Sequence, residues 1–239
     1  MSYDQYVRDK LVRVQPTGFE PGELHAGLFP HQHALVQWSL RRGRCAVFAD
    51  TGLGKTRIQL EWAARVHEHT GKDVLILAPL AVAAQTADEG VALGVNVTTC
   101  REQADVRPGV NITNYERLHR FTPSHFGAVV LDESSCIKHH DTRTLKMLLE
   151  AFADTPFKLC ATATPAPNDW TELGTHAEFL GICTRTEMLS EFFVHDGGET
   201  QSWRLKGHAQ AEFWRWVSTW AALVRNPADL GFDGSAYAL

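Results

Sequence analysis

Short apolar runs alternate with stretches of helical spacing over most of the chain. Bounded, mostly apolar runs predict strands at 45–49, 74–78, 110–113, 128–132 and 157–161. Runs of this kind are typical of strands buried on both faces of a parallel sheet. Between them the pattern predicts helices at about 33–42, 55–69, 81–92 and 142–153. The alternation favours an α/β fold, with a mostly parallel sheet flanked by helices.

The two ends of the chain depart from this pattern. Residues 1–27 mix charges with proline and glycine, so we expect an irregular arm. After residue 183 we expect no further strand. A tryptophan-rich stretch there has apolar residues at helical spacing, and Asn226-Pro227 would end its helix. The sequence therefore predicts an arm at 1–27, an α/β domain at 28–183 and a helical extension at 184–239.

Composition excludes several classes of protein. The 239 residues are 44% hydrophobic and 21% charged, which is typical of a globular protein and not of a disordered one. No apolar stretch is long enough to cross a membrane, and the first residues lack the apolar core of a secretory signal. Five cysteines without CxxC spacing favour a reducing cytoplasm, that of the host cell if a phage encodes the chain. A net charge of -5 shows no overall excess of positive charge for binding nucleic acid. It does not exclude a local groove that binds DNA.

The strongest chemical signal lies between the first predicted strand and the helix at 55–69. A glycine-rich turn there ends in Lys55 and Thr56, as in a phosphate-binding P-loop, although Ala49 stands where the usual pattern begins with glycine. Its glycines allow backbone N–H groups to approach phosphates, and the helix N-terminus adds partial positive charge. We expect Lys55 to reach the β- and γ-phosphates and the Thr56 hydroxyl to ligate Mg²⁺.

Polar side chains also follow two later strands and precede the first helix. Asp132 and Glu133 end the strand at 128–132, where Asp132 would hold Mg²⁺ and Glu133 would activate the attacking water. The hydroxyls of Thr162 and Thr164 could join this acidic pair to the sheet edge. The amide of Gln32 offers the donor and the acceptor that suit an adenine edge.

In this order, the motifs resemble those of the first RecA-like lobe of superfamily-two helicases, in the Swi/Snf-related branch with its phage members. The resemblance covers about 28–183 and is carried by LFPHQ (28–32), ADTGLGKT (49–56), LAPLAV (77–82), ITNYERL (112–118), DESSCIK (132–138) and ATATPAPNDWTELGTHAEFLG (161–181). It implies a RecA-like P-loop domain that uses ATP and Mg²⁺. The ATP contacts that it implies are Gln32, Thr51, Gly52, Leu53, Gly54, Lys55 and Thr56.

The resemblance also implies partners. Pro79, Asn114 and Arg117 lie in motifs that contact nucleic acid in the family, here expected to be duplex DNA bound with little sequence specificity. Members of the family hydrolyse ATP with a second RecA-like lobe that supplies an arginine finger. Residues 184–239 are too few for such a lobe, so we expect an ATP hydrolase that needs this lobe in cis or in trans.

One departure from the family concerns coupling between the motifs. Ser134 and Ser135 stand where relatives usually have alanine and histidine. Either Ser135 takes over the link to Thr162 and Thr164, or the coupling differs from that of the family. Ala163 replaces a glycine of the family motif, which is a mild change.

Other interpretations remain open on the sequence. The chain could be a non-catalytic ATP- or DNA-binding subunit, or another P-loop ATPase of the AAA or GTPase type. An Asn-Lys-x-Asp guanine motif is missing after Glu133, and AAA proteins lack the Gln32 element. The sequence does not separate translocation from strand unwinding. We interpret Cys136, His139 and His140 as solvated rather than metal-binding, and we expect core positions rather than base stacking for Trp203, Trp214, Trp216 and Trp220.

Overall fold

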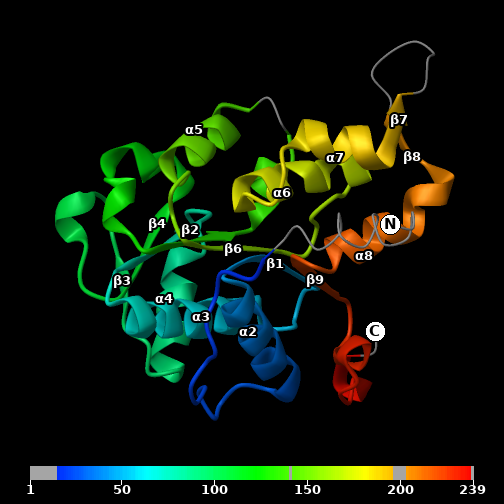
Figure 1. Ribbon diagram of the computed structural model, residues 1–239. Coiled ribbons are helices and arrows are strands. Elements are labelled where there is room, and N and C mark those ends of the chain that lie inside the picture. The colour runs from blue at the N-terminus through cyan, green and yellow to red at the C-terminus, as the bar shows by residue number, and fades with distance from the viewer. Residues whose placement is uncertain (1–14, 140–141, 196–202, 238–239) are drawn as a thin grey trace.

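A seven-stranded parallel sheet forms the centre of the protein in the computed structural model (Figure 1). The structure describes residues 15–139, 142–195 and 203–237. Across the sheet the strands follow the order β3 (Val97–Thr99), β4 (Val110–Asn114), β2 (Val74–Ala78), β5 (Ala128–Asp132), β6 (Phe157–Thr162), β1 (Arg44–Ala49) and β9 (Ala221–Val224). A separate antiparallel pair is formed by β7 (Phe193–His195) and β8 (Trp203–Leu205). The predicted α/β fold is confirmed.

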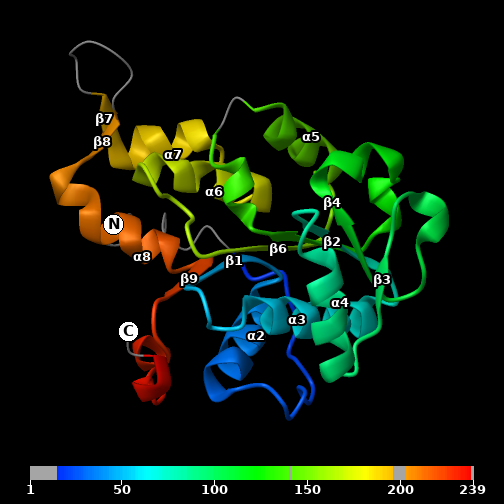
Figure 2. The ribbon, with the colours of Figure 1, turned by 180° about the vertical axis from the view of Figure 1, so that it is seen from behind.

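Helices cover both faces of this sheet (Figure 2). One face carries α2 (Pro30–Arg42), α3 (Lys55–Thr70) and α4 (Ala83–Ala92); the other carries α5 (Arg143–Ala151), α6 (Leu173–Leu180), α7 (Arg185–Phe192) and α8 (Gln210–Val217). Alternate residues of β1 enter two separate apolar cores, with Phe48 in one and Val47 in the other. Because both faces are covered, the central strands are apolar at nearly every position, as the pattern predicted.

All five predicted strands are present, with ends that differ by at most one residue. The predicted helices differ more at their ends. α2 begins at Pro30 rather than at about residue 33, since a proline fits the first turn of a helix. The side-chain oxygen of Gln32 also accepts a hydrogen bond from the backbone N–H of Phe29 at 3.0 Å, which satisfies a donor ahead of the first turn.

The helical tryptophan-rich region after residue 183 is confirmed by α7 and α8, but the expectation of no further strand is wrong. α8 ends at Val217, and β9 then runs parallel to β1 with Ala221 opposite Ala46. Trp220, directly before β9, and Val224, its last residue, are buried, although their spacing in the sequence is typical of a helix. A run of four residues carries little local signal, and β9 is stabilised by pairing with a strand that lies far away in the sequence.

Two of the four tryptophans expected in the core lie fully inside it. Trp216 is 7% exposed and Trp220 is completely buried. Their rings meet at 5.3 Å between centroids, and the ring of Phe48 from β1 packs edge-on against Trp220 at 6.2 Å. Trp203 and Trp214 pack against the margin of the same core. These rings attach α8 to the sheet beside the strand that leads into the P-loop.

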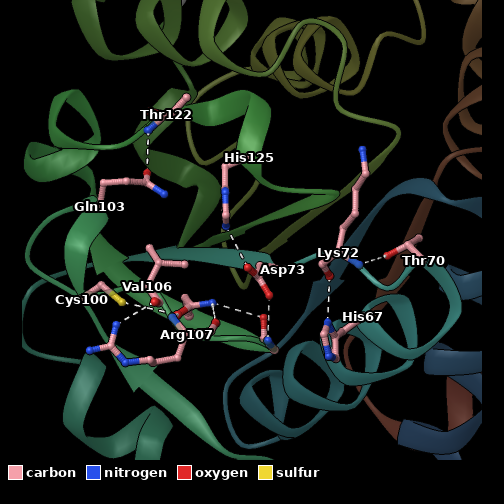
Figure 3. A network of polar contacts seen from close by, with 12 residues as sticks. His67, Thr70, Lys72, Asp73, Cys100, Gln103, Val106, Arg107, Thr122 and His125 are labelled. Atoms are coloured by element: carbon pink, nitrogen blue, oxygen red, sulfur yellow. Dashed lines mark hydrogen bonds and ion pairs between the residues drawn. The ribbon is translucent and has the colours of Figure 1, made fainter.

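A polar network ties together the loops at the amino ends of three strands (Figure 3). Asp73, just before β2, accepts a hydrogen bond from the N–H of Gly109, just before β4, at 2.9 Å. Its second oxygen lies 2.8 Å from Nε2 of His125, which precedes β5. The side chain of Asn111 bonds back to Arg107 and Gly109 in the same loop. These bonds hold the edge of the sheet opposite to the strand ends that carry the predicted site.

A buried lysine lies within β6. Lys158 is 3% exposed, and its Nζ donates a hydrogen bond to the carbonyl of Phe179, near the end of α6, at 3.0 Å. Burial, with a smaller contribution from Arg44, lowers the pKa of Lys158 to about 8. The folded state therefore disfavours the ammonium form, although the hydrogen bond satisfies one of its donors.

We expect Lys158→Met to remove a pH dependence from stability. Between pH 8 and the ordinary lysine pKa of 10.5, the unfolded chain binds a proton that the folded chain has lost, so the parent gains stability as the pH rises. From pH 8 to pH 10 the parent should gain about 2 kcal/mol in free energy of unfolding relative to the variant. Denaturant titrations at both pH values measure the free energy of unfolding of the parent and of the variant. The cysteines are the same in both proteins, so the effect of their ionisation cancels in the difference. The exposed Lys146→Met variant is the control, and an equal change for both variants would contradict the expectation.

Candidate nucleotide-binding site

The predicted phosphate loop joins the carboxyl end of β1 to the first turn of α3. Gly52 and Gly54 have φ values of 84° and 77°, in the left-handed region that side chains rarely adopt. A Cβ at Gly54 would also collide with the side-chain nitrogen of Gln32. Gly52 is therefore needed for the turn, and Gly54 is needed both for the turn and for the close approach of Gln32.

Lys55 is the first residue of α3, and its side chain lies back across the start of the loop. Its Nζ donates to the carbonyl of Ala49 at 3.0 Å and approaches that of Asp50 at 3.4 Å. The ammonium group is thus held beside the backbone N–H groups of a helix N-terminus. Both features favour an anion at this place.

Gln32 and His31 brace the loop from α2. Nε2 of Gln32 donates to the carbonyl of Leu53 at 3.2 Å, and Nε2 of His31 lies at the same distance from that oxygen. Gln32 is only 1% exposed, and its amide oxygen is bonded to the N–H of Phe29. The structure thus shows Gln32 as a support of the loop, and its contact with adenine stays a prediction.

The two acidic residues lie at the end of β5, in the middle of the sheet. Asp132 is 7% exposed, and its Oδ1 accepts a hydrogen bond of 2.7 Å from Nε2 of Gln59 in α3. Burial raises the pKa of Asp132, and the neighbouring carboxylate of Glu133 raises it further. A cation beside Asp132 would oppose both effects.

Glu133 has a strained backbone. With φ 48° and ψ 51°, it is the one residue other than glycine that has a positive φ in the described part of the chain. This conformation costs an L-residue about 1–2 kcal/mol. It directs the chain from β5 into the 3₁₀ turn Ser134–Ile137, while Oε2 of Glu133 accepts a hydrogen bond from Oγ1 of Thr162 at 3.2 Å. Backbone strain of this kind is often found at functional sites.

The structure links the acidic residues to β6 through Thr162 rather than through Ser135. Thr164 supports this link, because its N–H donates to Oγ1 of Thr162 at 3.2 Å. Over the described residues, the side chain of Ser135 forms no hydrogen bond with either threonine. The coupling role of Ser135 is therefore without support from the geometry.

The residues predicted to contact nucleic acid lie at the same edge of the sheet. Pro79 follows β2, Asn114 is the last residue of β4 and Arg117 lies in the turn after it. Asn114 is 8% exposed, and its side-chain oxygen accepts a hydrogen bond of 3.2 Å from the N–H of Arg117. Asn114 therefore shapes the turn, which leaves Arg117 and the backbone as the groups that could reach a ligand.

Sequence reasoning missed three residues that contact the acidic turn. Gln59 lies one helical turn after Thr56, which is a signal that could have been noticed. The hydroxyl of Tyr115 donates to the backbone carbonyl of Asp132 at 2.7 Å. Oγ of Ser134 lies 3.1 Å from Nε2 of His176, a residue of α6. Nothing in the spacing of Tyr115 or His176 pointed to these contacts.

The residues present fit a nucleotide with Mg²⁺. Thr56 and the buried, destabilised carboxylate of Asp132 offer the oxygen ligands that Mg²⁺ prefers, together with phosphate oxygens. Among the described residues, there is no group of three or more His, Cys, Asp or Glu side chains that could hold a metal ion. Cys136 and His139 belong to this part of the chain, whereas His140 lies outside the described residues.

Comparison with known proteins identifies the family. The DEAD/DEAH box helicase model matches residues 29–173, more than half of the chain, so the protein belongs to this family. Its fold is that of a RecA-like motor lobe of a helicase or translocase. No curated protein matches the sequence. The described helices contain none that is long and apolar enough to cross a membrane.

Solved structures share the fold at low identity. The SWI2/SNF2 ATPase core of Sulfolobus solfataricus in complex with dsDNA is 21% identical, with a TM-score of 0.68, and the match covers 87% of this chain and 46% of that one. The UvsW helicase of bacteriophage T4 is 15% identical, with a TM-score of 0.55 and coverage of 74% and 65%. The Hef helicase domain of Pyrococcus furiosus is 18% identical, with a TM-score of 0.51 and coverage of 63% and 36%. This chain thus spans about half of the first of these proteins.

The strain at Glu133 predicts an unusual order of stability for two variants. Glu133→Gly should be more stable than Glu133→Ala by about 1 kcal/mol, because glycine tolerates a positive φ and alanine does not. Both variants lose the carboxylate, so their difference isolates the backbone. Denaturant unfolding measures it. At the exposed Glu68 within α3 the same pair should show the opposite order, since glycine is unfavourable in a helix. Alanine as the more stable residue at position 133 would contradict the assigned strain.

Proposed function

We propose that the chain is the ATP-binding motor lobe of a DNA-dependent ATPase, a translocase of the Swi/Snf-related type that needs a second RecA-like lobe for full hydrolysis. The observation that carries the proposal is the convergence of Lys55, Asp132 and Glu133 at one edge of the sheet. A phosphate loop after β1 and two carboxylates at the end of β5, with only β6 between these strands, are the parts that phosphoryl transfer requires from one lobe.

Each residue has a separate task in this proposal. The loop from Thr51 to Thr56 surrounds the phosphates with backbone N–H groups, and the ammonium of Lys55 leaves the carbonyl of Ala49 to pair with them. Thr56 and Asp132 would hold Mg²⁺, which neutralises phosphate charge when bound. Glu133 orients the attacking water and accepts its proton, while the hydroxyl of Thr162 holds the carboxylate in place.

Duplex DNA is the proposed nucleic-acid partner. The Sulfolobus SWI2/SNF2 ATPase core was solved in complex with dsDNA. In this chain the loops with Pro79 and Arg117 follow the carboxyl ends of β2 and β4. Backbone N–H groups and one guanidinium suit phosphate oxygens, which carry no sequence information. We therefore propose binding with little sequence specificity.

An apolar hollow beside the phosphate loop supports the need for a second lobe. The hollow has a volume of about 480 Å³ and reaches Asp50 and Thr164 at the site. Trp170 and Leu223 in its lining are 44% and 43% exposed. Large apolar side chains exposed together are typical of an interaction surface. A lobe that covers them would also be positioned to place an arginine at the phosphates.

Lys55→Ala should abolish measurable ATP binding. The variant removes the cation held at the helix N-terminus, and the phosphate charge then lacks its strongest partner in the loop. Isothermal titration calorimetry with Mg²⁺ and ATP measures the effect. Lys72→Ala, at the opposite edge of the sheet, is the matched control and should keep the affinity of the parent. Equal affinity of Lys55→Ala and the parent would refute this assignment.

Turnover by residues 1–239 should be slow and weakly stimulated by DNA. An arginine finger contributes about 10³–10⁵ in rate where it has been measured, so a second lobe added in cis or in trans should produce a large gain. Steady-state ATPase assays with duplexes of several sequences test this, and the sequences should stimulate equally. Fast DNA-stimulated hydrolysis by the chain alone would show that the second lobe is not needed, whereas absence of turnover with the lobe supplied would favour a non-catalytic subunit.

Glu133→Gln should bind ATP without turnover, because the variant loses the carboxylate that orients the attacking water.

A further inference from the structure

A hydrogen bond from α6 reaches the acidic turn. His176 lies in α6 and is completely buried, as is Ser134, the residue directly after Glu133. Nε2 of His176 lies 3.1 Å from Oγ of Ser134. The ring of His176 also packs edge-on against Phe48 of β1, with 5.2 Å between centroids. The imidazole therefore lies between the strand that leads into the phosphate loop and the turn that carries Glu133.

The protonation of His176 follows from this environment. Burial lowers the pKa of His176 to about 4, so the ring is neutral at physiological pH. Nδ1 has no hydrogen-bond partner among the described residues, so the contact with Ser134 is the one hydrogen bond of this ring there. The neutral ring and the hydroxyl can each donate or accept, so the pair joins a donor to an acceptor in either tautomer.

The bond matters because Glu133 needs support on both sides. Before it, the hydroxyl of Tyr115 holds the carbonyl of Asp132 and so orients the peptide group that enters Glu133. After it, Ser134 is anchored to α6. A residue with a strained φ keeps that conformation only where its surroundings over-determine it. The link to Thr162 restrains the carboxylate itself and does not restrain the backbone that follows.

We propose that His176, acting through Ser134, is a positioning residue that holds Glu133 in its left-handed conformation and so directs its carboxylate toward the γ-phosphate side of the site. His176 is not a catalytic residue, since Ser134 stands between it and Glu133. The proposal rests on the proposed function for its kinetic consequence, but not for its structural one.

A double-mutant cycle tests this role. His176→Phe keeps the aromatic packing on Phe48 and removes the ring nitrogen, and Ser134→Ala removes the hydroxyl. Each single variant leaves a buried polar group without its partner and should lower the melting temperature. The double variant removes both partners, so its melting temperature should return close to that of the parent. Its rate of ATP hydrolysis in single-turnover assays should nevertheless stay about tenfold below the parent, with unchanged ATP affinity.

Two further variants sharpen the kinetic result. His176→Gln supplies an amide oxygen that can accept from Ser134, so it should recover most of the rate. Thr175→Val removes a buried hydroxyl that donates to the backbone carbonyl of Glu172, just before α6, at 2.8 Å, and should leave the rate unchanged. A double variant that regains both stability and the parental rate would overturn the proposal, because His176 would then serve only to satisfy Ser134.

A spectroscopic measurement separates this proposal from the proposed function. In ¹H–¹⁵N spectra, the backbone amide signal of Glu133 should shift in His176→Phe, which leaves Ser134 in place, and not in Thr175→Val. An unchanged Glu133 signal would overturn the positioning role, whatever the kinetics. A parent that neither binds nor hydrolyses ATP would refute the proposed function, and the shift of the Glu133 signal would still decide whether His176 holds the turn.

Discussion

The turn at Glu133 constrains the rest of the site. β5 must end and lead into a 3₁₀ turn within one residue, and that residue must also carry a carboxylate toward Thr162 of β6. Glycine would adopt the backbone conformation without strain but offers no acid. The chain keeps glutamate and accepts the strain, so the surrounding structure has to hold a conformation that Glu133 would not adopt alone.

Three consecutive residues meet this requirement by contacting four different parts of the fold. Asp132 bonds to Gln59 in α3 and, through its carbonyl, to Tyr115. Glu133 bonds to Thr162 at the end of β6, and Ser134 to His176 in α6. The helix that begins at the phosphate loop, the segment after β4 and the helix after β6 therefore meet in one turn. Tyr115 lies next to Asn114, so a ligand that moves this segment acts on the acidic residues through a single hydrogen bond.

The sequence predicted those features whose signals are local. The five apolar strands and the glycine-rich loop are short contiguous patterns, and Asp132 and Glu133 follow one of these strands directly. β9 was missed because its four residues are stabilised by β1, far away in the chain. Gln59, Tyr115 and His176 were missed for a related reason. Each acts through one bond to a residue 73, 17 or 42 positions away, and only Gln59, one helical turn after Thr56, carried a local signal.

The place of β9 in the sheet has a consequence for where the domain ends. The N–H of Asp50, the first residue of the phosphate loop, donates to the carbonyl of Val224 at 2.9 Å, and that of Ala46 donates to Trp220 at the same distance. A chain cut at residue 183 would lose both bonds and turn β1 into an apolar edge strand with free backbone groups. Such edges pair with other molecules, so a fragment chosen from the motifs alone would be prone to self-association and would carry an unanchored loop.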